Sequence, residues 1–299
     1  MNNFSGYDKR KSYFEGWYLK HQKEDEAISF IPSFHIDKMG RRTVSIQVIT
    51  KEGSYHFPFA VSQFSASRRH FCVKIENNVF SEKGISVNLK KDDFSVSGTL
   101  HYSPFQTLDT DIMGPFRYVP FMQCRHGVLS MTHALRGILK INGKKYDFSG
   151  GTGYVEKDFG TSFPISYVWT QCSDWNGNQD SSLMISTAHI PFGPVSFKGC
   201  ICAVWYQGKE YRLATYCGAR IVKGTKDSVE IRQGRYCLTA EKKKIPNQKE
   251  EGKELLAPKS GSMERVIKEN IACRVHYCLR KGKKVIFDFT SENASYEAV

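Results

Sequence analysis

A period of two in the apolar residues is the feature that most limits how this chain of 299 residues can fold. Short runs rich in Val, Ile, Phe, Tyr and Thr alternate with polar residues and end at turn residues, as in Phe94–Tyr102. Such alternation indicates half-buried β-strands, and the longer period of amphipathic helices is nearly absent. An all-β chain with short hairpins must protect its strand edges, which closed barrels do. We therefore predict an all-β fold of antiparallel strands.

Turn signals recur in both halves of the chain. Asn142–Gly143 is the strongest hairpin signal. Gln207–Gly208 and Lys281–Gly282 separate similar alternating runs in the second half. This recurrence predicts two related β-units, divided into domains at 1–150 and 151–299.

Three segments depart from the alternation. Ser103–Pro120 contains three prolines together with apolar side chains, which favours a lid or plug over a simple spacer. Glu241–Lys253 is rich in charge, and we expect it to be an exposed loop. Ser262 is a candidate cap for a short helix at Met263–Asn270.

Composition bears on the compartment and the partners. Nine cysteines, an odd number, follow an N-terminal sequence without the apolar stretch of a secretory signal, which predicts free thiols and a cytoplasmic protein. Cys200 and Cys202 lack the CxxC or His-rich partners of a zinc site, so we expect no metal.

The formal net charge of +13 points to a polyanionic partner. The basic residues are scattered along the chain, and no helix-turn-helix, zinc-finger or RNP-type stretch accompanies them. We therefore predict no nucleic-acid partner. Peripheral contact with an anionic membrane surface, on the inner face of a membrane, would account for the dispersed positive charge equally well. We keep this contact as an alternative.

The stretch richest in chemistry begins at Gly153 and reads GYVEKDFGTSFPISYVWTQC. On a strand its two carboxylates share a face with a tyrosine, and a turn at Gly160 leads to a second strand. Two carboxylates and several aromatic rings would then line one cavity suited to an apolar substrate. A solvated face beside ordinary core aromatics is the structural alternative. The residues are Tyr154, Glu156 and Asp158 on the first strand and Tyr167, Trp169 and Gln171 on the second.

A related pattern near the N-terminus, SYFEGWYLK, places Glu15 between Tyr13 and Trp17 on one strand face. Two histidines, His126 and His133, lie seven residues apart, so an unbroken strand would turn them to opposite faces. Each has a structural alternative as a core histidine. We retain His126 as a candidate for substrate binding.

Several of these stretches resemble the tocopherol cyclase family. They are YFEGWY at Tyr13–Tyr18, YVEKDFGTSFP at Tyr154–Pro164 and YVWTQC at Tyr167–Cys172, with weaker support from LLAPKSG at Leu255–Gly261. The likeness extends over essentially the whole chain. It implies two consecutive lipocalin-like (calycin) antiparallel β-barrel domains, with an apolar substrate held in or between them.

Plant and cyanobacterial members of that family close a chromanol ring on a prenylated quinol. The alkene of the prenyl tail is protonated, and the phenolic oxygen captures the tertiary cation, so the resemblance implies no cofactor. This chain has Asp158 where those cyclases have Asn, Phe159 where they have Trp, and His133 about where they have Gly. It also lacks their long insertions, and the resemblance does not supply its substrate.

The leading hypothesis is an acid-assisted cyclase, or a related hydratase or isomerase, that acts on a prenylated or otherwise apolar small molecule. Burial and a second nearby carboxylate both keep a carboxylic acid protonated, as alkene protonation requires. The candidate acids are Glu156, Asp158 and Glu15. The candidates for substrate binding are Tyr13, Trp17, Tyr154, Tyr167, Trp169, Gln171 and His126.

Two alternatives stay open. Glu156 could instead form an ion pair with a buried Arg or Lys that joins the two barrels, because structural ion pairs often imitate catalytic sites. The chain could also be a non-catalytic carrier of lipids or isoprenoids, since barrels of the lipocalin type hold one small ligand without chemistry.

Overall fold

The computed structural model describes residues 4–120, 122–173, 175, 181–192, 195–244 and 252–299. Within these residues the chain forms twenty-two strands and four short 3-10 helices, and it contains no α-helix. The strands pair antiparallel in two sheets. The prediction of an all-β, antiparallel fold is confirmed. No helix in the described part of the chain has the length and apolar character needed to cross a bilayer.

The described residues divide into two compact units that share the chain in alternation. Each unit is built from three separate segments, which lie both before and after the predicted division near Gly150. The strand at Thr152–Gly160, just after that position, belongs to the first unit. The first unit comprises Met1–Thr107, His126–Phe163 and Leu256–Arg265, and the second comprises Leu108–Arg125, Pro164–Leu255 and Val266–Val299.

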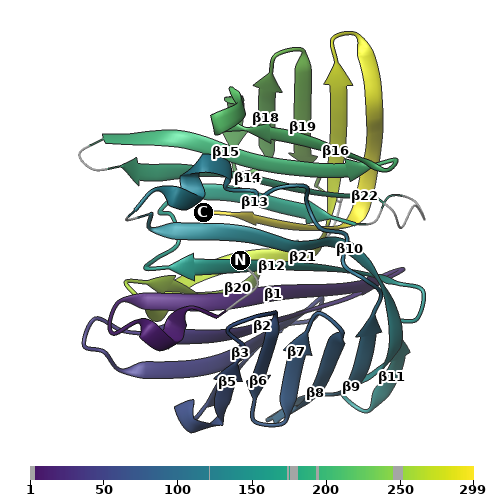
Figure 1. Ribbon diagram of the computed structural model, residues 1–299. Coiled ribbons are helices and arrows are strands. Elements are labelled where there is room, and N and C mark those ends of the chain that lie inside the picture. The colour runs from purple at the N-terminus through teal and green to yellow at the C-terminus, as the bar shows by residue number, and fades with distance from the viewer. Residues whose placement is uncertain (1–3, 121, 174, 176–180, 193–194, 245–251) are drawn as a thin grey trace. The chain divides into compact units, whose positions relative to one another are not determined.

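The sheet of the first unit has twelve strands in the order β4-β3-β2-β1-β12-β10-β9-β8-β7-β6-β5, with β11 paired to β10 (Figure 1). Most neighbours in this order are hairpin partners, and β1 with β12 joins strands from distant parts of the chain. The strands are β1 (Tyr13–Lys23), β2 (Glu26–Ile36), β3 (Arg42–Thr50), β4 (Ser54–Phe59), β5 (Phe64–Ala66), β6 (Cys72–Ile75), β7 (Asn78–Ser81), β8 (Gly84–Lys91), β9 (Phe94–Tyr102), β10 (Cys124–Ile141), β11 (Lys144–Asp147) and β12 (Thr152–Gly160).

The other sheet, most of which belongs to the second unit, has ten strands in the order β16-β15-β14-β13-β22-β21-β19-β18-β17, with β20 paired to β21. It is drawn in green to yellow in Figure 1. The strands are β13 (Tyr167–Cys172), β14 (Ser182–Phe192), β15 (Val195–Tyr206), β16 (Lys209–Ala214), β17 (Arg220–Thr225), β18 (Ser228–Gln233), β19 (Tyr236–Lys242), β20 (Lys253–Lys259), β21 (Ser262–Lys281) and β22 (Lys284–Ala298).

Side-chain alternation decides which residues enter each core. On β1, Trp17 and Leu19 belong to the hydrophobic core of the first unit, and on β12 Val155 does so. In the second unit, Val168 and Cys172 of β13 belong to the core. Because successive side chains on a strand point to opposite faces, residues at the intervening positions lie on the other face of each sheet.

The turns between strands follow the predicted chemistry. Asn142 and Gly143 have φ values of 47° and 84° between β10 and β11. A two-residue hairpin turn with both residues at positive φ suits the twist of the strands, and Asn-Gly adopts it at low cost. Gln207 and Gly208, between β15 and β16, have φ values of 50° and 71°. The prediction of these hairpins is confirmed.

The irregular segment that we predicted at Ser103–Pro120 contains no strand and only η3 (Gly114–Tyr118). The predicted helix at Met263–Asn270 is wrong, because these residues lie in β21. Ile267, Glu269 and Ile271 are buried there at alternate positions, and this strand burial overrides the local helix signal. Most of the predicted loop Glu241–Lys253 lies outside the described residues. The remaining 3-10 helices are η1 (Gly6–Asp8), η2 (Val61–Gln63) and η4 (Thr215–Cys217).

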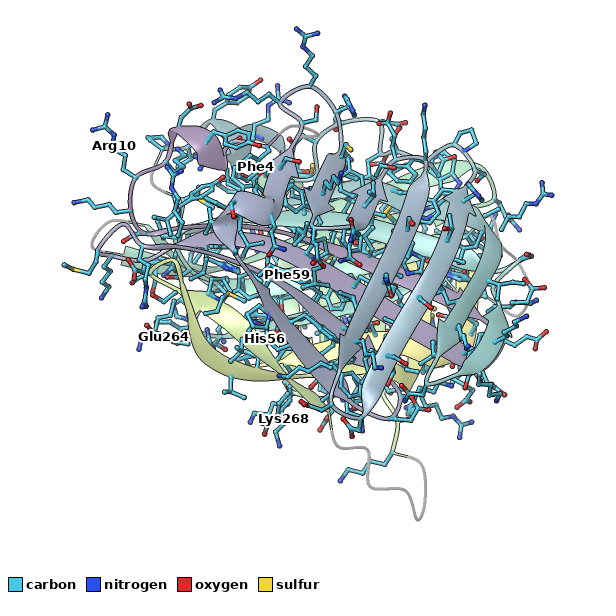
Figure 2. The ribbon with its side chains drawn as sticks, turned by 90° about the horizontal axis from the view of Figure 1, so that it is seen from below. Phe4, Arg10, His56, Phe59, Glu264 and Lys268 are labelled. Atoms are coloured by element: carbon cyan, nitrogen blue, oxygen red, sulfur yellow. The ribbon has the colours of Figure 1, made fainter. Side chains whose placement is uncertain are left out.

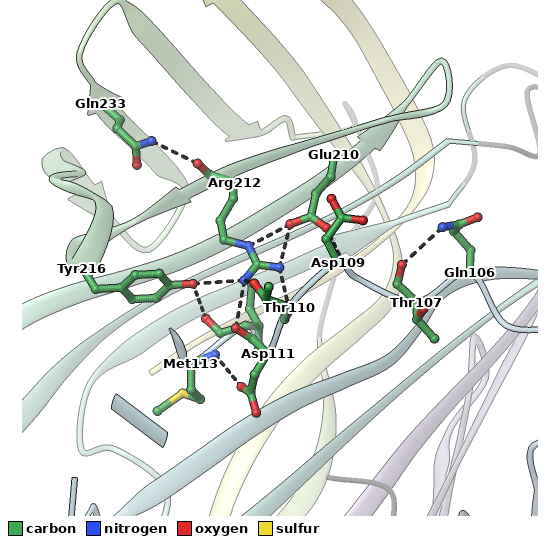
Figure 3. Close-up of polar contacts among 11 residues, drawn as sticks. Gln106, Thr107, Asp109, Thr110, Asp111, Met113, Glu210, Arg212, Tyr216 and Gln233 are labelled. Carbon is green, nitrogen blue, oxygen red and sulfur yellow. Dashed lines mark hydrogen bonds and ion pairs between the residues drawn. The ribbon is translucent and has the colours of Figure 1, made fainter. Parts of the chain in front are cut away.

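We name residues 109–118 of the second unit the strap. Arg212 of β16 binds the strap through several hydrogen bonds (Figure 3). Its guanidinium donates to Thr110 Oγ1 at 2.7 Å and to the carbonyl oxygens of Thr110 and Asp111 at 2.8 Å. Its Nε donates to Glu210 Oε1 at 2.8 Å, and Glu210 Oε2 accepts from the Asp109 amide at 2.8 Å. The strap is therefore held by charge-assisted hydrogen bonds rather than by sheet pairing.

Candidate functional site

The two carboxylates of β12 lie on the sheet face opposite the core of the first unit. Val155 packs in that core, so Tyr154, Glu156 and Asp158 share the other face. Register with β1 sets Glu156 opposite Tyr18. This face is nonetheless protected from solvent, since Glu156 is 5% exposed and Tyr154 is 1% exposed.

His126 connects the two carboxylates through its two ring nitrogens. Its Nδ1 lies 2.9 Å from Asp158 Oδ1, and its Nε2 lies 3.4 Å from Glu156 Oε2. The three side chains are 12%, 20% and 7% exposed in the order His126, Asp158 and Glu156. His126 stands near the start of β10, and β10 neighbours β12 in the sheet. Strand pairing thus brings together residues thirty positions apart.

Tyr154 completes this group. Its hydroxyl donates to Glu156 Oε2 at 2.7 Å. Burial, with a further contribution from Glu156, raises the pKa of Tyr154 well above its usual range. The phenol therefore keeps its proton at neutral pH and acts as a donor to the carboxylate. We name Tyr154, His126, Glu156 and Asp158 the carboxylate–histidine cluster.

The cluster could also hold a metal ion, because one ligating atom from each of His126, Glu156 and Asp158 lies within 4.8 Å of the others. The imidazole, however, offers a different nitrogen to each carboxylate. One ion could take only one of those nitrogens. His126 Nδ1 is within hydrogen-bond distance of Asp158, so this arrangement fits a proton shared between His126 and Asp158 without an ion.

Glu15 belongs to a different group on the other face of β1. Its Oε1 lies 2.5 Å from Lys157 Nζ, and both side chains are almost fully buried, at 0% and 1% exposed. The Tyr13 hydroxyl donates to Glu15 Oε2 at 2.6 Å, and the Ser5 amide donates to the same oxygen at 3.0 Å. Burial lowers the pKa of Lys157, and Glu15 opposes that shift. The third carboxylate is therefore a partner in a buried ion pair.

Trp17 packs beside this pair. Its ring stacks on Phe71 at a centroid distance of 6.2 Å, and Lys157 Nζ lies 5.5 Å from its centre. Tyr13, Glu15 and Trp17 share one strand face, as the sequence pattern predicts, but that face is not the one that carries Glu156 and Asp158.

The predicted aromatic face of the second strand belongs to the second unit. Tyr167 and Trp169 are 8% and 7% exposed, and Gln171 is fully buried. The Tyr167 hydroxyl donates to Glu297, and Gln171 Nε2 donates to Ser173 Oγ at 2.7 Å. Tyr167 and Gln171 thus have partners within their own unit, and we do not assign the three residues to the carboxylate–histidine cluster.

His133 lies in a further group in the first unit. Its Nδ1 is 2.9 Å from Ser130 Oγ, and its ring centre is 4.3 Å from that of Tyr102. The Tyr102 hydroxyl in turn is 2.5 Å from His21 Nε2. Burial lowers the pKa of His21 to about 3 and that of His133 well below its usual range. His126 and His133 thus have separate surroundings, which agrees with the expectation that they do not form a pair.

Comparison with known proteins bears on both family and fold. The family model described as "Tocopherol cyclase-like" matches residues 93–298. The chain belongs to the tocopherol cyclase-like family. The rice protein named "Probable tocopherol cyclase, chloroplastic" (Oryza sativa subsp. japonica) is 24% identical over 107 residues. That match covers 35% of this chain and 22% of the rice protein, so the two are related over only part of their lengths.

Solved structures establish the fold of this member of the tocopherol cyclase-like family. An AttH-type protein of Nitrosomonas europaea has a TM-score of 0.55 at 12% identity, over 98% of this chain and 94% of its own. Kievitone hydratase of Nectria haematococca has a TM-score of 0.50 at 10% identity, over 96% and 88%. The fold is lipocalin-like, with two antiparallel β-barrels, as the family resemblance implies.

Two functional contacts in this tocopherol cyclase-like chain escape a reading of the sequence. Lys157 is the partner of Glu15, and the register that sets Trp17 opposite Lys157 joins residues 140 positions apart. The sequence signal for His126 is weak, because no residue close to it in the chain indicates that it contacts two carboxylates. The alternation within β12 does indicate that Glu156 and Asp158 share a face.

Proposed function

We propose that this chain is an acid-assisted cyclase or hydratase that acts on a prenylated or otherwise apolar small molecule. The observation that carries the proposal is the His126 ring placed between two carboxylates, with Tyr154 donating to one of them. A histidine beside two carboxylates, largely protected from solvent, is suited to delivery of a proton to an unreactive alkene.

The chemistry follows from the order of the groups. Glu156 or Asp158 in its protonated form donates its proton to one alkene carbon, and a tertiary cation forms at the other. A phenolic oxygen of the same molecule, or a water molecule, then forms the new C–O bond and loses its proton to the carboxylate that gave one. The donor carboxylate is thereby protonated again, and His126 orients Asp158 through its hydrogen bond. Ring closure is an isomerisation, and capture of water is a hydration.

Tyr154 has a supporting role in this scheme. Its hydroxyl donates to Glu156 Oε2, which is also the oxygen that lies 3.4 Å from His126 Nε2. Because burial keeps the phenol protonated, the bond persists across the neutral pH range. Tyr154 therefore fixes the orientation of Glu156 without itself taking part in proton transfer.

Family membership and the names of two similar proteins, a probable tocopherol cyclase and a kievitone hydratase, support the reaction class. A hydratase adds water, and the family resemblance implies that a cyclase adds a phenolic oxygen across a prenyl double bond. The substrate proposed here is the same chemical class, an alkene-bearing prenyl group attached to a phenol or quinol.

The test uses turnover in deuterium oxide with a panel of prenylated hydroquinones and prenylated phenols. We expect one deuterium at a former alkene carbon, with ring closure or with addition of solvent oxygen. Glu156→Gln and Asp158→Asn each keep the shape of the side chain but remove an acid. Loss of a general acid lowers turnover by roughly 10²–10⁴-fold, while retention of the substrate by the folded variant should survive.

Glu26→Gln, an exposed carboxylate on β2, is the matched control and should turn over normally. Normal turnover in both cluster variants would exclude acid catalysis by this cluster. Binding of the panel by the wild-type protein, with no product and no deuterium in the recovered ligand, would favour the carrier function instead.

A further inference from the structure

One end of the first unit gathers basic residues from three segments. These segments are 7–12, 37–42 and 66–70, which the chain places beside η1, between β2 and β3, and after β5. We name this surface the basic end. It contains eight basic and two acidic residues, namely Lys9, Arg10, Lys11, Lys38, Arg41, Arg42, Arg68 and Arg69 with Asp8 and Asp37.

Hydrogen bonds hold the three segments together. The Ser12 amide donates to the Asp37 carbonyl at 2.9 Å, and Arg42 Nη2 donates to the Lys9 carbonyl at 3.4 Å. On the other side, the Ala66 amide donates to the Tyr7 hydroxyl at 2.9 Å. The positive charges are therefore collected on one built surface, although they are scattered along the sequence.

The two acidic residues are already engaged. Asp8 accepts two hydrogen bonds from Arg68, both at 3.0 Å. Asp37 accepts from the amides of Met39 and Arg41, each at 2.8 Å, and so shapes the turn. The basic side chains are exposed, and Arg10 projects away from the body of the unit in Figure 2. The surface keeps a strong net positive charge.

The basic end also presents an apolar side chain at the tip of its turn. Met39 is 91% exposed, flanked by Lys38 and Arg41. An exposed apolar residue between basic residues gains nothing from a polyphosphate backbone in water. At a bilayer it can enter the headgroup region while its neighbours contact anionic headgroups.

We propose that the basic end docks on the surface of an anionic phospholipid bilayer. Charge complementarity carries the proposal, and Met39 favours a bilayer over a nucleic acid. The proposal does not depend on turnover, since a carrier of apolar ligands would use the same surface. It does fit a substrate that partitions into membranes.

The experiment measures co-sedimentation of the full chain with two kinds of vesicle. One is phosphatidylcholine alone, and the other contains roughly 30% phosphatidylserine, the kind of lipid that gives the cytoplasmic leaflet its negative potential. We expect binding to the anionic vesicles and little to the neutral ones. Raising the salt from about 0.05 M to about 0.5 M should release most of the protein, because the Debye length becomes shorter than the gap between charges.

The test variant is Arg10→Gln/Lys38→Gln/Arg69→Gln, whose three side chains are exposed. Each basic residue near an anionic surface adds about fivefold to partitioning, so the variant should bind roughly a hundredfold more weakly. The matched control removes three exposed lysines of the second unit, as Lys223→Gln/Lys226→Gln/Lys283→Gln. It has the same net charge as the test variant and should bind like the wild-type protein.

Met39→Ser separates docking from simple charge attraction, and it should lower the binding that survives at high salt. Circular dichroism of every variant should match the wild-type protein, since the altered residues are exposed. Three results would overturn the proposal: equal binding to both kinds of vesicle, equal loss in the control variant, or displacement from anionic vesicles by an RNA duplex at equal phosphate concentration.

Discussion

The carboxylates Glu15 and Glu156 both come from motifs of the same kind, Tyr-x-Glu, yet the fold gives them different surroundings. Each accepts a hydrogen bond from the tyrosine two residues before it, Tyr13 at 2.6 Å and Tyr154 at 2.7 Å. The difference lies in the next neighbour, which is Lys157 for Glu15 and His126 for Glu156. A lysine partner fixes a charge, whereas an imidazole can exchange a proton at neutral pH.

The Glu15–Lys157 pair predicts a large effect on stability. Glu15→Gln leaves the Lys157 ammonium buried without its carboxylate, and breaking such a pair costs about 3–5 kcal/mol. Urea unfolding should report this loss. Glu15→Gln/Lys157→Met removes both charges and should recover much of it. A Glu15→Gln variant within about 0.5 kcal/mol of the wild-type protein would show that the pair is not structural.

Sequence reasoning reaches part of this arrangement. Alternation within one strand is enough to place Tyr154, Glu156 and Asp158 on a common face. It cannot supply contacts between strands, because those depend on register. The partners of Glu15 and of both carboxylates in β12 come from strands far away in the chain, so Lys157 and His126 enter only with the structure.

At the scale of elements, the strap shows how a segment without sheet pairing is held in place. Arg212 binds two backbone carbonyls of the strap, and Tyr216 donates to the Ile112 carbonyl at 2.8 Å. The three prolines that we read from the sequence explain why residues 103–120 form no strand. Arg212 lies about a hundred residues after the strap in the sequence, so no local sequence pattern predicts their contact.

Arg212→Ala should release the strap while the sheet of the second unit persists. Hydrogen exchange at residues 110–118 should accelerate by at least tenfold, because several hydrogen bonds to a charged group, each contributing about 1.5–3 kcal/mol, are lost. Arg212→Lys should rescue little, since a lysine cannot form the same planar set of bonds. Arg232→Ala, which removes an exposed ion pair with Glu230, is the control. Unchanged exchange in Arg212→Ala would mean that packing alone holds the strap.

At the scale of the whole molecule, buried histidines predict acid lability. Burial lowers the pKa of His21 and of His35 to about 3, from 6.5 in an unfolded chain. Between about pH 6.5 and pH 3 the unfolded chain therefore binds protons that the folded chain does not. The free energy of unfolding is at its full value above pH 6.5 and falls as the pH falls, by about 1.4 kcal/mol per pH unit for each histidine.

Urea titrations between pH 7.5 and pH 4.5 measure this slope. His21→Gln keeps an acceptor for the Tyr102 hydroxyl and should reduce the slope by about 1.4 kcal/mol per pH unit. His101→Gln, at an exposed position, should leave it unchanged. A wild-type stability that does not vary across this range would contradict neutral burial of these histidines.

The fold class is the part of the whole molecule that the sequence predicts best. A period of two and short turn signals are local, and they are enough to indicate antiparallel strands. Each of the nine cysteines, all of which the structure describes, has a free thiol, as expected. The division into units is not local, because it depends on which distant segments pair.

The interleaving of the two units has a consequence for synthesis on the ribosome. Gln47 in β3 binds the backbone of Leu256 through both ends of its amide, at 2.9 Å and 2.8 Å. Its partner is translated 209 residues later. The twelve strands of the first sheet end at Gly160, so that sheet can form before Leu256 is synthesised, whereas the first unit is complete only when Leu256–Arg265 has joined it. Until then the Gln47 amide lacks its backbone partners, and we expect the first unit to reach its full stability only after most of the second unit has been translated.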